Sequence, residues 1–185
     1  MGKQFDSLSE KLSAFIAEQK LFFVGTATDD SRVNISPKGM DSLRVLGPNR
    51  VVWLNVTGSG NETSAHVQIN PRMTIMFAAF EGKPLILRLY GTANVIHHTD
   101  EQWPALSALF NPTVGARQIF DFTVEMVQTS CGMAVPYLSY DSDRELLTNW
   151  ATQQGEDGIN RYWENKNQNT IDGIPTHIVE KNLGS

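Results

Sequence analysis

A glycine-rich turn between an apolar strand and a polar helix start, Gly58 to Ser64, has the clearest potential for chemistry in this chain. Glycines let the backbone approach a ligand closely, and the free N–H groups at a helix start favour an anion. Neutral side-chain donors lie in and beside the turn: Thr57, Ser59, Asn61, Thr63 and Ser64. The pattern indicates a phosphate site, although such side chains also serve as ordinary helix caps.

Two basic residues occupy positions where a positive charge needs an explanation. Lys38 stands between Pro37 and Gly39, and Arg88 interrupts the apolar run Leu85 to Leu89. A buried arginine is costly without an anionic or polar partner, so Arg88 indicates either an internal salt bridge or a ligand contact. Lys38 is interpreted in the same way, as an exposed turn lysine or as a ligand contact.

Side-chain catalysis and metal binding have little support. Cys131 is the single cysteine, which excludes an intramolecular disulfide and a cysteine zinc cluster, and we expect it to be a small buried residue. The histidines lack a recognisable ligand spacing, so no metal site is expected. No residue is spaced as a committed acid, base or nucleophile, and catalytic residues are not predicted. This favours chemistry supplied by a bound cofactor.

The elements that must position these residues follow from apolar periodicity. The spacing predicts a helix from Ser7 to Gln19, started by the capping-box pattern Ser7 to Glu10. Alternating or apolar segments between Gly, Pro and Asn turns predict about six antiparallel strands in hairpin order. The predicted strands are 21–28, 32–36, 43–46, 50–55, 73–80, 85–95 and 119–130, and the predicted helices are 61–69, 100–110 and a polar segment at 143–167. Pro37 to Gly39 is expected to end its strand. This pattern is typical of a small antiparallel barrel.

Composition sets broad limits on the class of protein. A chain of 185 residues, 41% hydrophobic and 19% charged, suits a single globular domain over 1–185. The net charge of -5, without a basic block, argues against nucleic acid as a partner. No apolar run reaches bilayer length and no leader segment is recognised, so no membrane contact and a cytoplasmic location are expected.

Six motifs occur in a recognisable order, and together they are more specific than any one of them. They are Phe23–Thr26, Arg32–Gly39, Gly58–His66, Asn70–Arg72, Glu81–Gly91 and Thr129–Pro136. In this order the chain resembles the pyridoxamine 5′-phosphate oxidase-like, FMN-binding split-barrel superfamily, and within it a subgroup of pyridoxamine 5′-phosphate oxidase-related FMN-binding proteins. The resemblance covers a core at about 21–136, and a helical extension at 137–185 fits the subgroup.

The resemblance implies a mainly β fold with helices, an antiparallel split β-barrel with a C-terminal helical tail. It also implies a homodimer that holds FMN in clefts between the subunits, with a small-molecule redox partner. The implied cofactor-binding residues are Asn34, Ser36, Pro37, Lys38, Gly39, Asn55, Thr57, Gly58, Ser59, Asn61, Thr63, Ser64, Arg88, Ser130, Cys131 and Gly132. Arg88 is expected to reach the flavin from the partner side, and Ser130 to Pro136 to line the cleft opposite the ring.

Two features separate the chain from the true oxidases. Where these carry an Arg-Lys pair at the phosphate turn, this chain has Glu62 to Ser64, so charge is expected from Lys38, Arg32 or Arg88, with Glu62 pointing away. The C-terminal Arg-x-His substrate signature is absent. The resemblance therefore implies an FMN-dependent oxidoreductase with an unknown substrate. The alternatives are a non-catalytic flavin carrier or redox sensor, and a member of the fold that uses deazaflavin F420 or haem.

Overall fold

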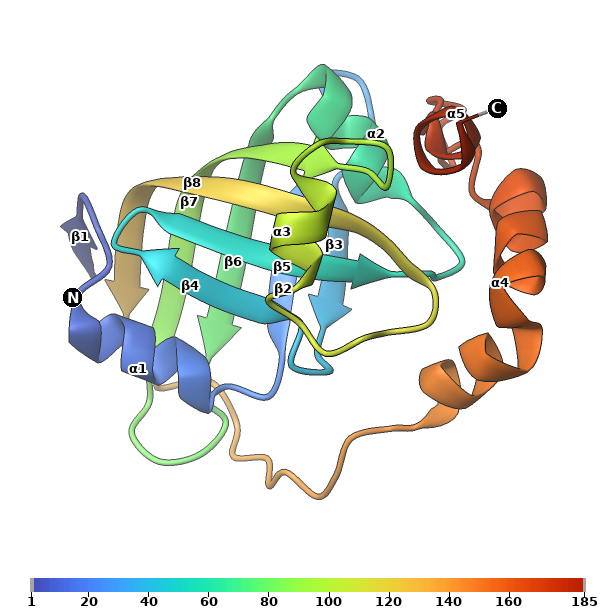
Figure 1. Cartoon of the computed structure of the whole chain (residues 1–185). Coiled ribbons are helices and arrows are strands. Elements are labelled where there is room, and N and C mark those ends of the chain that lie inside the picture. The colour runs from blue at the N-terminus through green and yellow to red at the C-terminus, as the bar shows by residue number, and fades with distance from the viewer. Residues whose placement is uncertain (1, 185) are drawn as a thin grey trace.

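The strands form one curled antiparallel sheet, in a computed structural model that describes residues 2–184 (Figure 1). The strand order is β3-β2-β6-β7-β8-β5-β4, with β1 paired to β8. The strands are β1 Lys3–Phe5, β2 Phe22–Thr26, β3 Asn34–Lys38, β4 Leu43–Gly47, β5 Arg50–Val56, β6 Arg72–Ala78, β7 Ile86–Ile96 and β8 Ala116–Ser130. Every neighbouring pair is antiparallel, which confirms the predicted mainly β split-barrel architecture.

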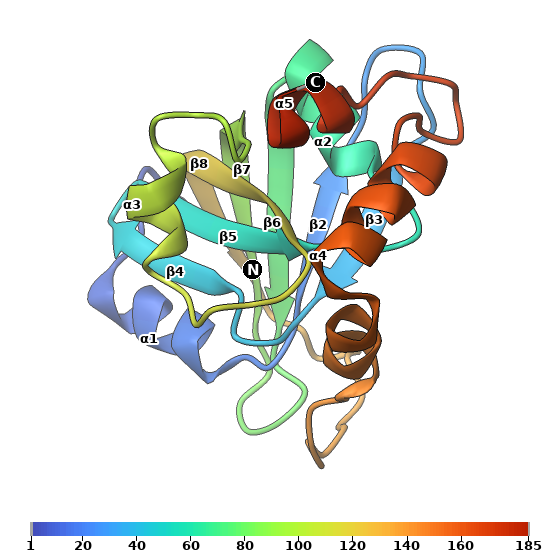
Figure 2. The ribbon, with the colours of Figure 1, turned by 45° about the vertical axis from the view of Figure 1, so that its right-hand side comes forward.

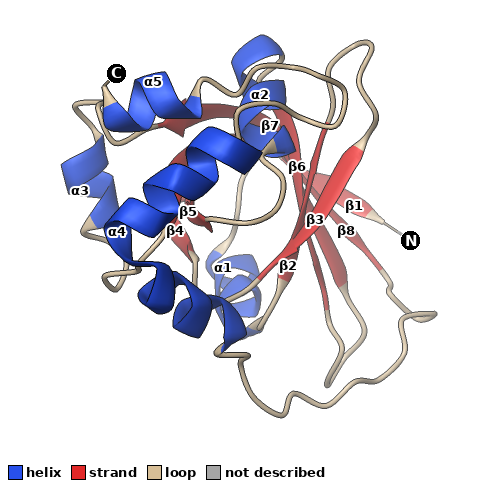
Figure 3. Ribbon diagram, turned by 90° about the vertical axis from the view of Figure 1, so that its right-hand side faces the viewer, coloured by secondary structure: helices blue, strands red, loops and turns tan. Residues whose placement is uncertain are grey.

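Five helices accompany the sheet within residues 2–184: α1 Glu10–Glu18, α2 Glu62–Ile69, α3 Trp103–Ser107, α4 Leu146–Lys166 and α5 Ile178–Leu183. Figure 2 shows α5 beside α2, and α4 running past the ends of the strands. In Figure 3 these helices gather on one side of the sheet, so the outer face of β3, β2, β6 and β7 has no described helix over it. None of the described helices is both long and apolar enough to span a bilayer.

Several predicted boundaries were wrong for identifiable reasons. Helix α1 is capped by Ser9, whose Oγ accepts from the N–H of Leu12, and the capping-box residue Ser7 lies outside the helix. Strand β3 continues through Pro37, because β3 is an edge strand that pairs only with β2 and can tolerate a missing N–H. Strand β8 begins at Ala116, three residues before the predicted start, and α3 is shorter than predicted.

The apolar core lies between the inner face of the sheet and α1. Its largest fully buried side chains include Trp53, Phe77, Phe120 and Phe122, and Trp53 stacks on Phe120 with 4.5 Å between the ring centres. The C-terminal helices have a small core of their own, formed by Ala151, Ile159, Trp163 and Ile178. Helix α4 is kinked at its middle, where Gly155 has φ 63°.

Candidate anion and cofactor site

The glycine turn leads directly into α2, with Asn61 at the N-cap position. Asn61, Thr63 and Ser64 are 2%, 5% and 0% exposed. Asn61 makes no side-chain capping hydrogen bond, and both polar atoms of its amide are buried without a partner among the described residues. A buried amide without partners is costly, so a ligand oxygen or donor at this position would be worth more than at an exposed one.

The hydroxyl groups of Thr63 and Ser64 keep their own hydrogens free. Thr63 Oγ1 accepts from Asn34 Nδ2 at 3.1 Å, and Ser64 Oγ accepts from Gln68 Nε2 at 3.3 Å. In both contacts the hydroxyl is the acceptor, so its proton remains available for another acceptor. Ser59, at the tip of the turn, is exposed.

Thr57 is already fully engaged inside the protein. Its Oγ1 donates to the carbonyl of Gly115 at 2.8 Å and accepts from the indole Nε1 of Trp163 at 2.9 Å. The side chain is 1% exposed. Thr57 therefore joins the turn to α4, and its hydroxyl proton is not free for a ligand.

Alternation along β3 sorts its side chains between two faces. Asn34, Ser36 and Lys38 are half-buried on the inner face, whereas Val33, Ile35 and Pro37 are exposed on the outer face. The contact from Asn34 to Thr63 shows that the inner face of β3 meets the start of α2. The sheet thus brings Asn34 to the start of α2 and Lys38 into the cavity beside Gly58.

Lys38 lies in an unusual environment for a lysine. Its Nζ is 5.3 Å from the centre of the Trp53 ring, a cation–π arrangement. Burial, together with the nearby charge of Arg117, lowers the pKa of Lys38 to about 8, and the charge of Glu62 acts in the opposite direction. The ammonium group is therefore charged at pH 7. A bound anion would lower the free-energy cost of burying this charge.

Arg117 on β8 is the second buried cation, and the sequence pattern does not single it out. The residue is 2% exposed. Its guanidinium donates to the carbonyls of Gly60 at 3.0 Å and Gly58 at 3.5 Å, and to the side-chain oxygens of Asn167 at 2.7 Å and Gln118 at 3.1 Å. All of these acceptors are neutral.

No salt bridge joins Arg117 or Lys38 to a carboxylate within residues 2–184. Burial lowers the pKa of Arg117 to about 9, with Glu62 acting in the opposite direction, and the guanidinium stays charged at pH 7. The carboxylate of Glu62 lies close to Gly60, so close that a Cβ added at Gly60 would overlap it. The expectation that Glu62 points away from the turn was therefore wrong.

The other two arginines predicted to supply charge lie elsewhere. Arg32 forms an exposed ion pair with Asp172. Arg88 donates to Ser130 Oγ at 3.2 Å. Neither guanidinium forms a hydrogen bond or a salt bridge with the glycine turn. Within one chain the positive charge near the turn therefore comes from Lys38 and Arg117.

Strand register places Arg88 on the outer face of the sheet. Pro37, Phe23, Met76 and Arg88 are direct partners across four strands. Directly opposed residues project from the same face, so Arg88 lies on the face opposite to Lys38. Within one chain, Arg88 and Ser130 are therefore separated by the sheet from the turn.

The segment that follows β8, from Cys131 onward, is largely exposed. Cys131 is exposed, so the expectation that it is buried was wrong, and Gly132 has φ 64° with the backbone of Leu85 packed against it. A side chain at Gly132 would be strained by this φ and crowded by Leu85. The close approach therefore joins this segment to the loop before β7, away from the glycine turn.

A cavity of about 230 Å³ borders the turn. Leu147 of α4 and the loop after α3 complete its wall. Asn55 in this wall is 3% exposed and donates to Gln118 Oε1 at 3.0 Å. The cavity brings together six of the predicted cofactor residues: Pro37, Lys38, Gly39, Asn55, Thr57 and Gly58.

A wider groove of about 590 Å³ lies on the outer face of the sheet. Phe23, Val33, Ile35 and Tyr90 contribute apolar surface to it, and Arg88 lies in its wall. Val33 and Ile35 are 71% and 68% exposed. Exposed aliphatic side chains on an edge strand are unusual unless another surface covers them.

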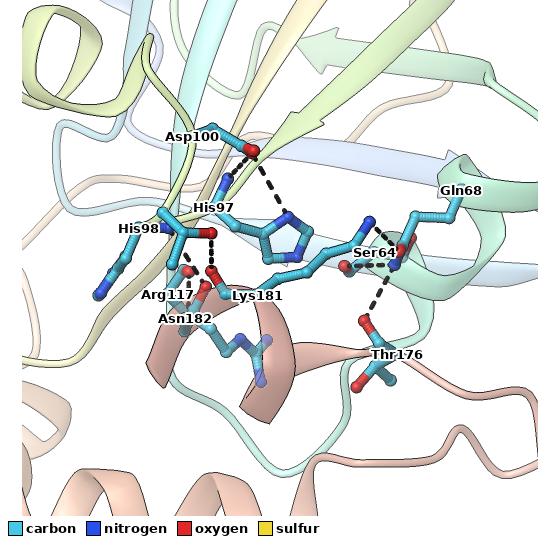
Figure 4. A network of polar contacts seen from close by, with 10 residues as sticks. Ser64, Gln68, His97, His98, Asp100, Arg117, Thr176, Lys181 and Asn182 are labelled. Atoms are coloured by element: carbon cyan, nitrogen blue, oxygen red, sulfur yellow. Dashed lines mark hydrogen bonds and ion pairs between the residues drawn. The ribbon is translucent and has the colours of Figure 1, made fainter. Parts of the chain in front are cut away.

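Helix α5 reaches the site from the C-terminal side (Figure 4). Lys181 Nζ donates to Gln68 Oε1 at 2.9 Å, and Gln68 Nε2 donates to the carbonyl of Ser64 at 3.0 Å. Asn182 Nδ2 donates to the carbonyl of Arg117 at 2.8 Å. The last helix therefore supports both α2 and the start of β8.

Comparison with known proteins gives a family match and a relative that matches most of this chain. The family described as pyridoxamine 5′-phosphate oxidase matches residues 8–131. A pyridoxamine 5′-phosphate oxidase family protein of Aspergillus flavus, ustO, is 34% identical over 191 residues, which cover 92% of this chain and 76% of the relative. The second match covers more of this chain than residues 8–131.

Solved structures share the fold at low sequence identity. A variant of HupZ from Group A Streptococcus has a TM-score of 0.54 at 18% identity, over 66% of this chain and 98% of that one. A putative pyridoxamine 5′-phosphate oxidase from Lactobacillus delbrueckii has a TM-score of 0.52 at 18% identity, over 66% and 94% of the two chains. These similarities concern the fold alone.

Proposed function

The chain belongs to the pyridoxamine 5′-phosphate oxidase family, and from this premise we propose that it binds FMN, with the phosphate at the Gly58 to Ser64 turn, and acts as an oxidoreductase. One observation carries the placement of the phosphate. Lys38 and Arg117 hold two positive charges beside the turn without a salt bridge to any carboxylate in residues 2–184.

The two cations favour a dianionic ligand over a neutral one. Removing charged groups from water costs free energy, and this cost is offset only by an opposite charge or by many hydrogen bonds. Arg117 has hydrogen bonds but no salt bridge, the charge of Glu62 only partly opposes the effect of burial, and each of the two cations disfavours the other. A phosphate with nearly two negative charges relieves both effects.

Neutral donors support the same placement. The amide of Asn61 is buried without a partner, and the hydroxyl protons of Thr63 and Ser64 are free. Neutral groups of this kind, with the N–H groups of the turn, replace the Arg-Lys pair of the true oxidases. The residues present therefore fit a flavin phosphate.

The flavin site is completed by a second copy of the chain. Arg88, Ser130, Cys131 and Gly132 lie away from the turn of their own chain, so they contact the same flavin only from a partner subunit. The exposed aliphatic pair on β3 and the groove around Arg88 support a homodimer formed through the outer face of the sheet.

When bound, FMN supplies hydride and electron transfer, and this chain supplies binding, orientation and electrostatics. Lys38 holds a proton and a positive charge in the wall of the cavity beside the turn. Asn55, fixed by Gln118, provides a rigid polar wall in the same cavity. Leu147 adds apolar surface to the lining of the same cavity.

Titration with FMN and with riboflavin tests this proposal. We expect a yellow protein that absorbs near ~450 nm and binds FMN at least about 100-fold more tightly than riboflavin, which lacks the phosphate. A colourless protein that takes up neither flavin would contradict the proposal. Anaerobic reduction by NADH or NADPH, followed by a screen of acceptors, then distinguishes an oxidoreductase from a flavin carrier.

FMN affinity is expected to fall as the pH rises through about 8, the pKa of Lys38. Below this value the ammonium group is charged and attracts the phosphate, and above it the lysine is neutral. We expect about a tenfold loss of affinity between pH 7 and 9, measured by fluorescence titration. Riboflavin binding should not change over this range, and Lys38→Met should abolish the pH dependence. A pH-independent FMN affinity in the unmodified protein would remove Lys38 from the phosphate site.

Replacing Glu62 by glutamine is expected to strengthen FMN binding about five- to tenfold. The carboxylate folds over Gly60 and opposes an incoming dianion, so removing its charge favours the phosphate. Riboflavin affinity should stay constant, and Glu18→Gln, an exposed change on α1, is the matched control. Weaker FMN binding by Glu62→Gln would instead mean that the carboxylate supports the turn.

A further inference from the structure

Asn167, which directly follows α4, is bonded to the glycine turn through its entire side-chain amide. The residue is 0% exposed. Its Nδ2 donates to the carbonyls of Gly58 at 3.0 Å and Ser59 at 3.4 Å, and its Oδ1 accepts from Arg117 at 2.7 Å. Asn167 thus links the turn and the buried guanidinium.

Asn167 and Arg117 together bind three consecutive carbonyl groups, those of Gly58, Ser59 and Gly60. In a planar trans peptide the carbonyl and the following N–H point in opposite directions. The N–H groups of residues 59–61 are therefore directed away from Asn167 and Arg117. None of these three donates to a backbone carbonyl in the described chain, so they are free to bind an anion.

The C-terminal segment holds Asn167 in place at several points. Thr176 Oγ1 donates to the carbonyl of Asn167 at 2.6 Å, and Trp163 on the preceding turn of α4 donates to Thr57. Asn182 of α5 bonds the carbonyl of Arg117. The donors of these contacts, Trp163, Thr176 and Asn182, lie outside residues 8–131, the part of the chain that matches the family.

We propose that Asn167 is a positioning residue of the anion site. Through it the C-terminal segment fixes Arg117 behind the turn and directs three N–H groups toward the phosphate. This inference rests on the proposed function, and it adds a contribution from a segment beyond the family match. Arg117 then acts on the phosphate through the intervening peptide groups, whose dipoles point the same way.

The test is the ratio of FMN affinity to riboflavin affinity in Asn167→Ala. We expect FMN affinity to fall about tenfold and riboflavin affinity to change less than twofold, because only the phosphate contact depends on the turn. Asn165→Ala, an exposed change on α4, is the matched control and should leave both affinities unchanged. Inorganic phosphate should also compete with FMN less well in Asn167→Ala than in the unmodified protein.

A merely structural role for Asn167 would lower both affinities equally or neither, and either result overturns the inference. If Asn167→Ala does not fold, Asn167→Asp decides the question, since it keeps the contact with Arg117. Its carboxylate neutralises Arg117 and faces the turn carbonyls, so FMN affinity should fall more than tenfold with riboflavin affinity retained. Failure of the unmodified protein to bind FMN would instead reject the proposed function.

Discussion

Replacing Arg117 by methionine is expected to lower FMN affinity about 100-fold and to leave riboflavin affinity nearly unchanged. In the proposed site the guanidinium is separated from the phosphate by one layer of peptide groups, roughly 8 Å, and at this distance each unit of ligand charge is expected to contribute about 2 kcal/mol at an effective dielectric constant near 20. For a phosphate with nearly two charges the attraction amounts to about 4 kcal/mol, and the variant loses part of it. Because about 1.4 kcal/mol corresponds to a factor of ten, a 100-fold loss is expected.

The comparison with Lys11→Met controls for a general loss of positive charge. Lys11 is exposed on α1 and forms no salt bridge within residues 2–184. We expect this control to leave FMN affinity within a factor of two. Thermal unfolding measured alongside separates binding from stability, since Arg117→Met also leaves the carbonyls of Gly58 and Gly60 without a donor. An unchanged FMN dissociation constant in a folded Arg117→Met protein would show that the phosphate lies elsewhere.

Two aspartates, Val33→Asp just before β3 and Ile35→Asp on β3, are expected to convert the proposed dimer into a 20.6 kDa monomer that has lost its flavin. Both side chains project from the outer face of the sheet and are 71% and 68% exposed in the single chain. Placing carboxylates in an apolar interface costs several kcal/mol, which is about the free energy that holds a moderate dimer together. Light scattering after size-exclusion chromatography gives the mass, and absorbance gives the flavin content.

Leu46→Asp and Leu109→Asp serve as controls for this double variant. These leucines are 39% and 38% exposed and lie on β4 and just after α3, away from the outer face of β3. They should leave the mass and the flavin content unchanged. A Val33→Asp, Ile35→Asp protein that remains dimeric and yellow would place the subunit interface on a different surface.

Local pattern was sufficient to predict seven of the eight strands, because alternating burial leaves a clear period of two in the sequence, whereas the short strand β1, Lys3–Phe5, was not predicted. Each of the predicted strands is present, and the turn before α2 falls where Gly58 and Gly60 indicate it. Boundaries failed where position in the sheet outweighed local preference. Pro37 lies inside β3 because β3 is an edge strand, and an isolated sequence does not reveal which strand is at the edge.

The candidate site was predicted only for its contiguous parts. The sequence indicates the glycine turn, but Arg117 is a charged residue in a buried strand position, against the usual pattern of strand interiors. Its contacts with Gly58 and Gly60 join residues 59 and 57 positions apart. The hydrogen bonds from Asn167 to Gly58 and from Trp163 to Thr57 span more than 100 positions. Pairings of this length depend on the completed fold and leave no local periodicity.

Gly58 and Asn167 are 109 positions apart in the sequence, so the two halves of this contact are synthesised at different times. During translation the sheet leaves the ribosome before α4, and at ordinary synthesis rates of ~5–20 residues per second Asn167 follows the turn by roughly 5 to 20 seconds. Until then the carbonyls of the turn lack one of their two donors. We therefore expect the proposed cofactor to be captured only after almost the whole chain has been made.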